Sequence, residues 1–258
     1  MLDTTQAYGL TCDSGEFARA ELDLLLACAA RTAPGAYLDV GGNIGALALP
    51  FAARRPEWRV LAVEAHPGLS SVLAQNARAN GLGNVEVVQS AAGASVGSIE
   101  FPSLALSGHG NFGMLRIGMD RPTQSVPLTT LDVIAPSDTR LVKVDVEGFE
   151  AEVFKGAQRL VREVRPAWVF EVSPEREAVA RACLATMLEA SYRLFWFYAP
   201  FVLPEPMKGA VPFDRKQGDL NVLALPGDAL DWALTEIGSA DAPWPTYREA
   251  MSYIRRYL

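Results

Sequence analysis

The sequence predicts an α/β fold with a mostly parallel β-sheet and helices on both faces of that sheet. Short apolar runs of strand length alternate along the chain with longer segments of helical periodicity, as in consecutive βα units. The second run is apolar almost throughout, as expected of a strand covered on both faces. A glycine-rich turn follows the first run directly, and such a turn brings backbone N–H groups up to a ligand.

Length and composition exclude several classes of protein. Half of the 258 residues are hydrophobic, so the chain can bury a substantial core. The net charge of −7 argues against a nucleic-acid or anionic-membrane partner. Cys12, Cys28 and Cys183 show no C-x-x-C spacing, so neither a disulfide framework nor a cysteine zinc site is expected. With no signal peptide or membrane span predicted, we expect a cytoplasmic protein.

The first elements surround the glycine-rich turn. Residues 16–31 have an apolar helical face, and we expect this helix to cover the core or the mouth of a binding site. The first strand spans residues 37–40, and an alanine-rich helix follows the turn as far as Ala53. Gly41 and Gly45 permit dihedral angles and close approaches that a Cβ atom would block.

The spacing of this turn distinguishes two nucleotide-binding motifs. A nicotinamide or flavin site requires G-x-G-x-x-G, but Gly41, Asn43 and Ala46 stand at those positions. The pattern D-x-G-x-N-x-G instead resembles the first motif of class I S-adenosyl-L-methionine (SAM) methyltransferases. In those enzymes the acid, here Asp39, helps hold the methionine end of the cofactor, whose amino group is cationic. A plain glycine-rich turn of another α/β protein is the alternative.

The second and third strands add two further candidate contacts. The strand over residues 59–64 ends in Glu64, at the distance from the turn where an acid accepts hydrogen bonds from both ribose hydroxyls. A solvated surface acid is the alternative. A helix over residues 68–80 and a strand over 85–88 follow. Ser90 and Ala91 then lie at a carboxyl strand end, where we assign them to the adenine rim.

The alternation of predicted strands and helices is interrupted before the fourth strand. Residues 98–101 and 124–128 are predicted as strands, and the glycine-flanked loop between them holds His109, one of only two histidines. A short helix is expected to begin at Thr129 or Thr130. The fourth strand, over residues 141–146, is followed by a helix that extends to about Glu163.

The last third of the chain predicts a strand over residues 168–172, a helix over 174–190, and strands over 195–198 and 220–225. The proline-punctuated segment 200–218 is too long for an ordinary hairpin turn. We interpret it as a lid or an acceptor-site loop, with an inert surface excursion as the alternative. Residues 247–258 are predicted as an amphipathic helix that either packs on the core or forms a homodimer contact.

Four motifs in order resemble the FkbM family of SAM-dependent methyltransferases. The family pattern is approximately D-V-G-A-N-x-G, then E-P-x-P, then T-L-D, then K-x-D-V-E-G-x-E with a following x-x-G-A. The matching residues are Asp39, Gly41, Asn43 and Gly45; Glu64 and Pro67; Thr130, Leu131 and Asp132; and Lys143, Asp145, Glu147, Gly148, Glu150, Gly156 and Ala157. Gly42 and Ala65 depart from the usual alanine and proline, and neither change removes a polar contact. The resemblance spans about residues 35–175, and four ordered motifs are more specific than any one.

The resemblance implies a Rossmann-like class I methyltransferase fold, with a mostly parallel seven-stranded sheet and a late antiparallel hairpin. It implies SAM as the cofactor and a small-molecule hydroxyl, of a sugar or natural product, as the acceptor. N-methylation and a nucleoside-binding module without catalysis are the alternatives. We expect a single domain over residues 1–258, with a helical cap over 1–34, the family core over 35–175 and a C-terminal part over 176–258.

Carboxylates are the candidates for catalysis. Asp145, Glu147 and Glu171 are expected to converge at the carboxyl ends of the fourth and fifth strands. We predict that Asp145 faces the sulfonium or the acceptor, and that Asp145 or Glu147 removes the acceptor proton, with His109 as the alternative base. Glu147 could instead be an acid favoured by a helix dipole. Lys143 is expected to pair with an acid if it is buried. A cluster of carboxylates could also bind magnesium, but no metal is predicted, because the motif offers no histidine and few obvious ligands.

Overall fold

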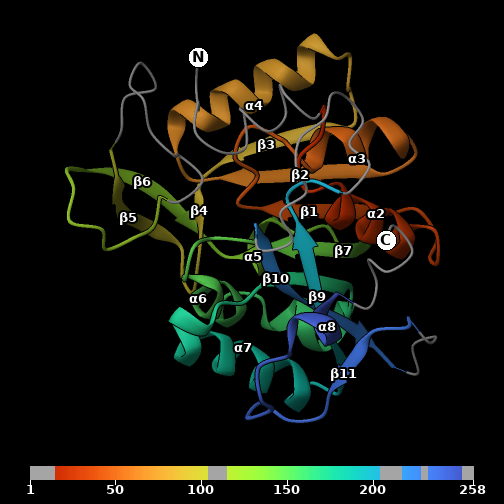
Figure 1. Cartoon of the computed structure of the whole chain (residues 1–258). Coiled ribbons are helices and arrows are strands. Elements are labelled where there is room, and N and C mark those ends of the chain that lie inside the picture. Colours follow the sequence, from red (N-terminus) through yellow and green to blue (C-terminus); the bar gives the residue numbers. More distant parts are fainter. Residues whose placement is uncertain (1–14, 104–114, 204–216, 228–231, 252–258) are drawn as a thin grey trace.

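The computed structural model describes residues 15–103, 115–203, 217–227 and 232–251, which form two β-sheets with flanking helices (Figure 1). The main sheet has the strand order β11-β9-β10-β8-β7-β1-β2-β3, and the second sheet has the order β4-β6-β5. The strands of the main sheet are β1 (Ala36–Val40), β2 (Arg59–Glu64), β3 (Val85–Gln89), β7 (Thr139–Val144), β8 (Ala167–Glu171), β9 (Tyr192–Pro200), β10 (Gly218–Pro226) and β11 (Thr235–Ile237). The second sheet consists of β4 (Ala91–Ala92), β5 (Gly97–Pro102) and β6 (Thr123–Thr129).

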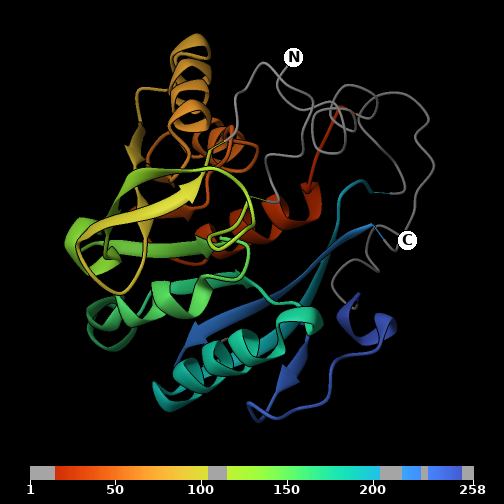
Figure 2. The same ribbon diagram turned by 90° about the vertical axis from the view of Figure 1, so that its left-hand side faces the viewer.

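Helices lie on both faces of the main sheet, and Figure 2 shows α2 and α7 on opposite sides of it. The α-helices are α2 (Arg19–Ala29), α3 (Ala48–Arg54), α4 (Pro67–Ala79), α5 (Leu131–Ile134), α6 (Glu150–Lys155), α7 (Glu177–Glu189) and α8 (Tyr247–Ala250). A π-helix, η2 (Leu160–Val164), and a 3-10 helix, η3 (Pro174–Arg176), complete the described elements. None of the described helices combines the length and the apolar composition needed to cross a bilayer.

The strand order confirms the predicted fold class. Strands β3, β2, β1, β7 and β8 pair in parallel, and β10 runs antiparallel between β8 and β9. The sequence order of the strands reverses between β1 and β7: β2 and β3 follow β1 on one side, and β8 follows β7 on the other. This is the switch point where α/β sheets bind ligands. The described sheet has one strand more than the seven expected, because the short β11 pairs with the outer edge of β9.

Two apolar cores explain why the central strands carry continuous hydrophobic runs. On one face, Leu24 and Leu25 of α2 pack with Phe51 of α3. On the other face, Phe154 of α6 and Leu184 of α7 pack against the sheet. Every residue of β1 is buried, because helices cover both faces of the sheet at this strand.

Several predicted elements differ from the observed ones in extent. The helix expected to reach Glu163 is interrupted: α6 ends at Lys155, and the π-helix η2 follows. A Cβ atom at Gly156 would lie 2.0 Å from the carbonyl oxygen of Gly93, so the backbones of two segments meet here. Strands β5 and β6 confirm the prediction for residues 98–101 and 124–128, but they form a separate sheet with β4. His109, most of the 200–218 segment and the C-terminal helix beyond residue 251 lie outside the described residues.

The T-L-D motif has a structural role. The Asp132 carboxylate accepts hydrogen bonds from the backbone N–H groups of Arg159 at 2.8 Å and Leu160 at 3.0 Å. The Asp132 N–H donates to the carbonyl of Gly156 at 3.0 Å. One side chain therefore joins α5 to the turn that opens η2, and satisfies two N–H groups at that helix start.

We expect Asp132→Ala to lower the free energy of unfolding by about 1–3 kcal/mol, because two backbone donors lose their acceptor. The measurement is chemical denaturation, compared with Asp120→Ala, which removes an exposed aspartate. Equal stability of the two variants would contradict this role for Asp132.

Candidate functional site

A cavity of about 400 Å³ opens at the carboxyl ends of the parallel strands, beside the switch point between β1 and β7. Its volume lies in the range of small-molecule sites. Most of the predicted site residues line it, namely Asp39, Gly41, Asn43, Glu64, Ser90, Ala91, Asp145 and Glu147. Gly45 is not among the lining residues; its N–H donates to the carbonyl of Gly42 and its positive φ shapes the turn.

Strand register places the polar residues of the site on one face of the sheet. Asp39 of β1 lies opposite Lys143 of β7 and opposite Ala62 of β2. Because side chains alternate between faces, Glu64, two residues after Ala62, projects to the same face. Glu64 of β2, Asp39 of β1 and Lys143 of β7 therefore project in a row from neighbouring strands to the same face of the sheet.

The same row continues on β8 and β10. Lys143 pairs with Val169, so Glu171 shares its face, and Glu171 lies opposite Asn221 of β10. Asp219, two residues before Asn221, therefore projects to this face as well. Helix α2 lies on this face: most of its buried residues join the apolar core, and Glu21 lines the cavity, so the first helix covers the core and also borders the binding site.

Gly41 lets the turn after β1 close against the end of β7. Its φ is +88°, and an added Cβ would lie 1.8 Å from the carbonyl oxygen of Asp145. The Asp145 N–H donates to the carbonyl of Val40 at 3.0 Å. A side chain at position 41 would force these two loops apart, so the glycine is required by a close backbone approach.

Glu64 is held by the turn that it supports. Its two carboxylate oxygens accept hydrogen bonds from the N–H groups of Asn43 at 2.9 Å and His66 at 2.8 Å. Burial raises the pKa of Glu64 to about 7, although these two hydrogen bonds oppose the shift. A carboxylate has about four lone-pair sites, so each oxygen can accept one further bond. The side chain therefore retains the capacity to bind both hydroxyls of a ribose.

Asp39 lines the cavity and has an unsatisfied oxygen. The residue is 2% exposed, and its Oδ1 has no hydrogen-bond partner in the described part of the chain. Burial raises the pKa of Asp39, and the positive charge of Lys143 opposes that shift. A cationic ligand group would satisfy this oxygen. Together with Glu64, this residue fits a ligand that carries both a ribose diol and an amine, as SAM does.

The two residues assigned to the adenine rim differ in how free they are to contact a ligand. Ser90 and Ala91 both line the cavity. The Ser90 hydroxyl, however, contacts the carbonyl of Pro127 at 2.9 Å and lies within 2.9 Å of the carbonyl of Ala91. Its hydrogen-bonding capacity is therefore used largely within the protein, and Ser90 fixes the end of β3 beside the small sheet.

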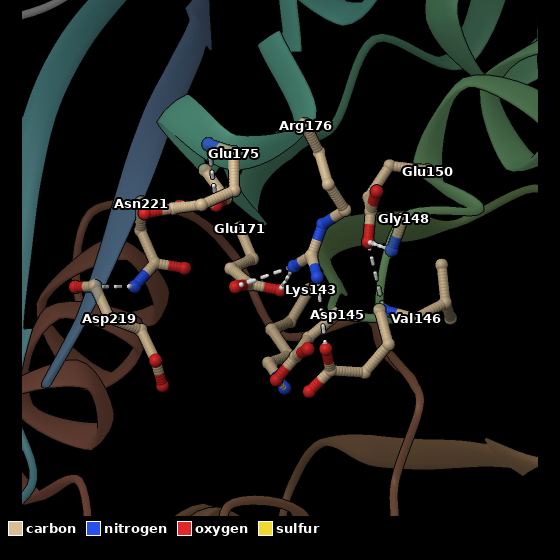
Figure 3. Close-up of polar contacts among 12 residues, drawn as sticks. Lys143, Asp145, Val146, Gly148, Glu150, Glu171, Glu175, Arg176, Asp219 and Asn221 are labelled. Atoms are coloured by element: carbon tan, nitrogen blue, oxygen red, sulfur yellow. Dashed lines mark hydrogen bonds and ion pairs between the residues drawn. The ribbon is translucent and has the colours of Figure 1, made fainter. Parts of the chain in front are cut away.

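Arginine 176 organises the acidic end of the site, as Figure 3 shows. Its guanidinium contacts both oxygens of Glu171, at 3.0 and 3.1 Å, and Oε2 of Glu147 at 3.2 Å. Gly148 leaves room for it, because a Cβ there would lie 2.7 Å from the Arg176 side chain. The predicted convergence of Asp145, Glu147 and Glu171 is confirmed, since one oxygen from each lies within 4.8 Å of the others.

Lys143 is buried and pairs with Asp145, as expected. Its Nζ lies 3.0 Å from Oδ2 of Asp145. Burial alone would lower the pKa of Lys143, but the charges of Asp145, Glu21 and Asp39 outweigh it and raise the pKa. The lysine therefore remains cationic and compensates several carboxylates at once.

The acids around Arg176 differ in their protonation. Burial and the charge of Asp145 raise the pKa of Glu147 to about 7, while Arg176 opposes the shift. Burial and neighbouring acids also raise the pKa of Glu171. The helix-dipole interpretation fits Glu150 better than Glu147, because Oε1 of Glu150 accepts the N–H groups of Val146 and Gly148. Glu147 is thus an acid whose ionisation changes near neutral pH.

Three charged lining residues were missed by sequence reasoning: Glu21, Arg176 and Asp219. None belongs to a motif, and each comes from an element outside the four matched segments. For Arg176 the only sequence signal is a cation five residues after a predicted strand-end acid. Glu21 and Asp219 become recognisable only when α2 and β10 are placed against the sheet.

Comparison with known proteins gives one family match. Residues 39–194, more than half of the chain, match the family described as Methyltransferase FkbM domain. No curated protein matches the chain.

Among solved structures, methyltransferase FkbM from Methylobacillus flagellatus is 16% identical with a TM-score of 0.48; the match covers 76% of this chain but only 45% of that one. Precorrin-6y C5,15-methyltransferase from Geobacter metallireducens is 12% identical over 80% of this chain and 87% of its own, with a TM-score of 0.49. The O-methyltransferase TomG from Streptomyces achromogenes is 18% identical over 81% and 80%, with a TM-score of 0.47. At these identities and TM-scores, the family match carries the assignment.

We expect Glu64→Ala to weaken SAM binding by roughly ten- to a hundredfold, because a charge-assisted hydrogen bond contributes roughly 1.5–3 kcal/mol. Calorimetry is the measurement, at a temperature where the variant remains folded. Glu86→Ala is the matched control, since Glu86 is exposed on the neighbouring strand β3 and does not line the cavity. Wild-type affinity in Glu64→Ala would remove Glu64 from the ribose site.

Proposed function

Because the chain belongs to the FkbM family of SAM-dependent methyltransferases, we propose that it transfers a methyl group to a hydroxyl of a small molecule, a sugar or another natural product. The observation that carries this proposal is the row of acids across the strand ends. Asp39 and Glu64 fit the cofactor at one side of the row. Glu147, Glu171 and Asp219 then border the remaining side of the same cavity, where the acceptor is proposed to bind.

When bound, SAM supplies a methyl group on a cationic sulfur, an electrophile that needs no further activation. What the chain must provide is placement of the acceptor, worth roughly 7–11 kcal/mol, and removal of its proton. Asp145 is ion-paired with Lys143 and lies between the two sides of the site, so it is suited to face positive charge.

Glu147 is the base that we propose. Its carboxylate lies in the cavity wall, and its pKa of about 7 allows a large ionised fraction at neutral pH. The hydroxyl oxygen would form the new bond to the methyl carbon as the carbon–sulfur bond breaks and leaves neutral S-adenosylhomocysteine. The hydroxyl proton would pass to the Glu147 carboxylate, from which water can remove it. Arg176 limits the movement of the carboxylate by holding Oε2.

N-methylation is the second candidate. The acidic side of the cavity holds Glu147, Glu171 and Asp219 against one arginine. Burial raises the pKa of each of these acids, and a cationic acceptor would favour their ionised forms. A mass-spectrometric screen of candidate acceptors with labelled SAM distinguishes the possibilities. Label on oxygen supports the first proposal, label on nitrogen supports the second, and no transfer to any acceptor class would favour a nucleoside-binding module.

We also propose that the partner is a small-molecule acceptor in the cytoplasm, without nucleic acid or membrane. Phe201, which lies in the 200–218 segment just after β9, and Asp219 of β10, which follows that segment, both line the cavity, which supports an acceptor role for the segment. The homodimer contact and the single-domain organisation stay predictions.

Glu147→Gln should abolish the proton transfer and lower kcat by roughly 10²–10⁴-fold with SAM affinity unchanged. In the wild type, kcat should rise with pH and level off above about 7, because only the ionised form of Glu147 accepts a proton. His109→Asn is the comparison variant. If only His109→Asn loses turnover while binding is intact, the base is the histidine.

Turnover should survive excess EDTA. Asp145, Glu147 and Glu171 lie close enough to share a cation, but the Arg176 guanidinium already bonds two of them. A divalent ion would have to displace that guanidinium or share its ligands. Loss of turnover in EDTA with recovery on adding magnesium would instead make Asp145 a metal ligand.

A further inference from the structure

Glu21 is a buried acid in the first turn of α2 that no motif accounts for. Its side chain is only 4% exposed, and it lines the cavity together with Asp39. Within the described ranges, its carboxylate makes no hydrogen bond or ion pair, and its Oε1 is buried without a partner. A buried carboxylate oxygen left in this state is costly, so its position on a cavity wall points to a ligand that supplies a donor.

The unsatisfied oxygens of Glu21 and Asp39 belong to one neighbourhood. Burial and then the charges of Asp39 and Glu21 raise the pKa of Tyr37, so both acids lie near its hydroxyl. That hydroxyl has a single proton and can satisfy at most one of the two oxygens. The nearby Lys143 ammonium is hydrogen-bonded to Asp145. A donor group that enters the cavity would therefore complete the bonding of at least one of these oxygens.

An ammonium group matches this pair of acceptors, because it offers three donors and no acceptor. Strand order indicates which ammonium. Glu64, on β2, is the ribose ligand of the proposed site, and β1 with Asp39 is the adjacent strand. With the ribose at Glu64 and the adenine at the proposed rim beside β3, the methionine of SAM would extend the other way, toward β1 and β7, and its α-amino group is cationic. The neutral ribose has no group of this kind.

We propose that Glu21, together with Asp39, binds the α-ammonium group of the cofactor's methionine. The inference rests on the proposed cofactor site and assigns a role to a residue of the N-terminal helix. It also accounts for a buried acid on a helix whose other buried residues are apolar or small. Burial raises the pKa of Glu21 to about 7, and a bound ammonium would favour its ionised form.

The test is a binding cycle with S-adenosylhomocysteine and the analogue of it that lacks only the α-amino group. In the wild type, calorimetry should show that loss of the amino group weakens binding by roughly ten- to a hundredfold. In Glu21→Gln, S-adenosylhomocysteine should lose roughly tenfold in affinity while the analogue loses little. The contribution of the amino group would then shrink in the variant, as expected when both changes remove one contact.

Asp23→Asn is the matched control, because Asp23 is on the same helix but does not line the cavity. Glu21→Asp retains the charge and should show an intermediate loss, which separates a lost contact from a folding defect. Equal losses for both ligands in Glu21→Gln, or no loss, would overturn the proposal. Failure of the wild-type protein to bind S-adenosylhomocysteine would instead overturn the cofactor site itself.

Discussion

The site depends on one buried cation, Lys143, at the strand where the order of the sheet reverses. An ammonium in an apolar strand is tolerated only with compensating charge, and Asp145 supplies it directly at 3.0 Å. The compensation is mutual, because Glu21 and Asp39 are also buried nearby and rely on the same positive charge. A neutral residue at this position would leave a group of carboxylates facing each other in a low-dielectric pocket.

The acids of the row are held in different ways, and this difference matches the proposed division between cofactor binding and proton transfer. Glu64 is fixed by two backbone amides, which suits a rigid contact. Glu147 is held by one side-chain contact and is about one-fifth exposed, which suits a group that must exchange protons. Arg176 holds only the acids on the proposed acceptor side, because its guanidinium bonds Glu147 and Glu171.

Local features, such as a strand with its following turn, could be predicted from the sequence because they depend on residues that are contiguous in the chain. The strand, turn and acid around Asp39 follow from apolar periodicity and glycine spacing, and Glu64 follows from its distance to that turn. Arg176, Glu21 and Asp219 could not be predicted, because their roles arise when separate elements pack against one sheet edge. The break after α6 was missed for the same reason: at Gly156 the limiting contact is with Gly93, far away in the sequence.

The fit between Gly148 and Arg176 links a motif position to a position outside every motif. The glycine adopts a φ of +98°, and any Cβ there would meet the arginine side chain that ties Glu147 to Glu171. The two positions are therefore coupled in one direction. A side chain at position 148 would force the flexible end of Arg176 to shift away from the two acids. Loss of the arginine would not free the glycine in the same way, because a φ of +98° favours glycine whatever stands beside it. Position 176 can therefore change while the glycine is kept, whereas a change at position 148 would also displace the arginine.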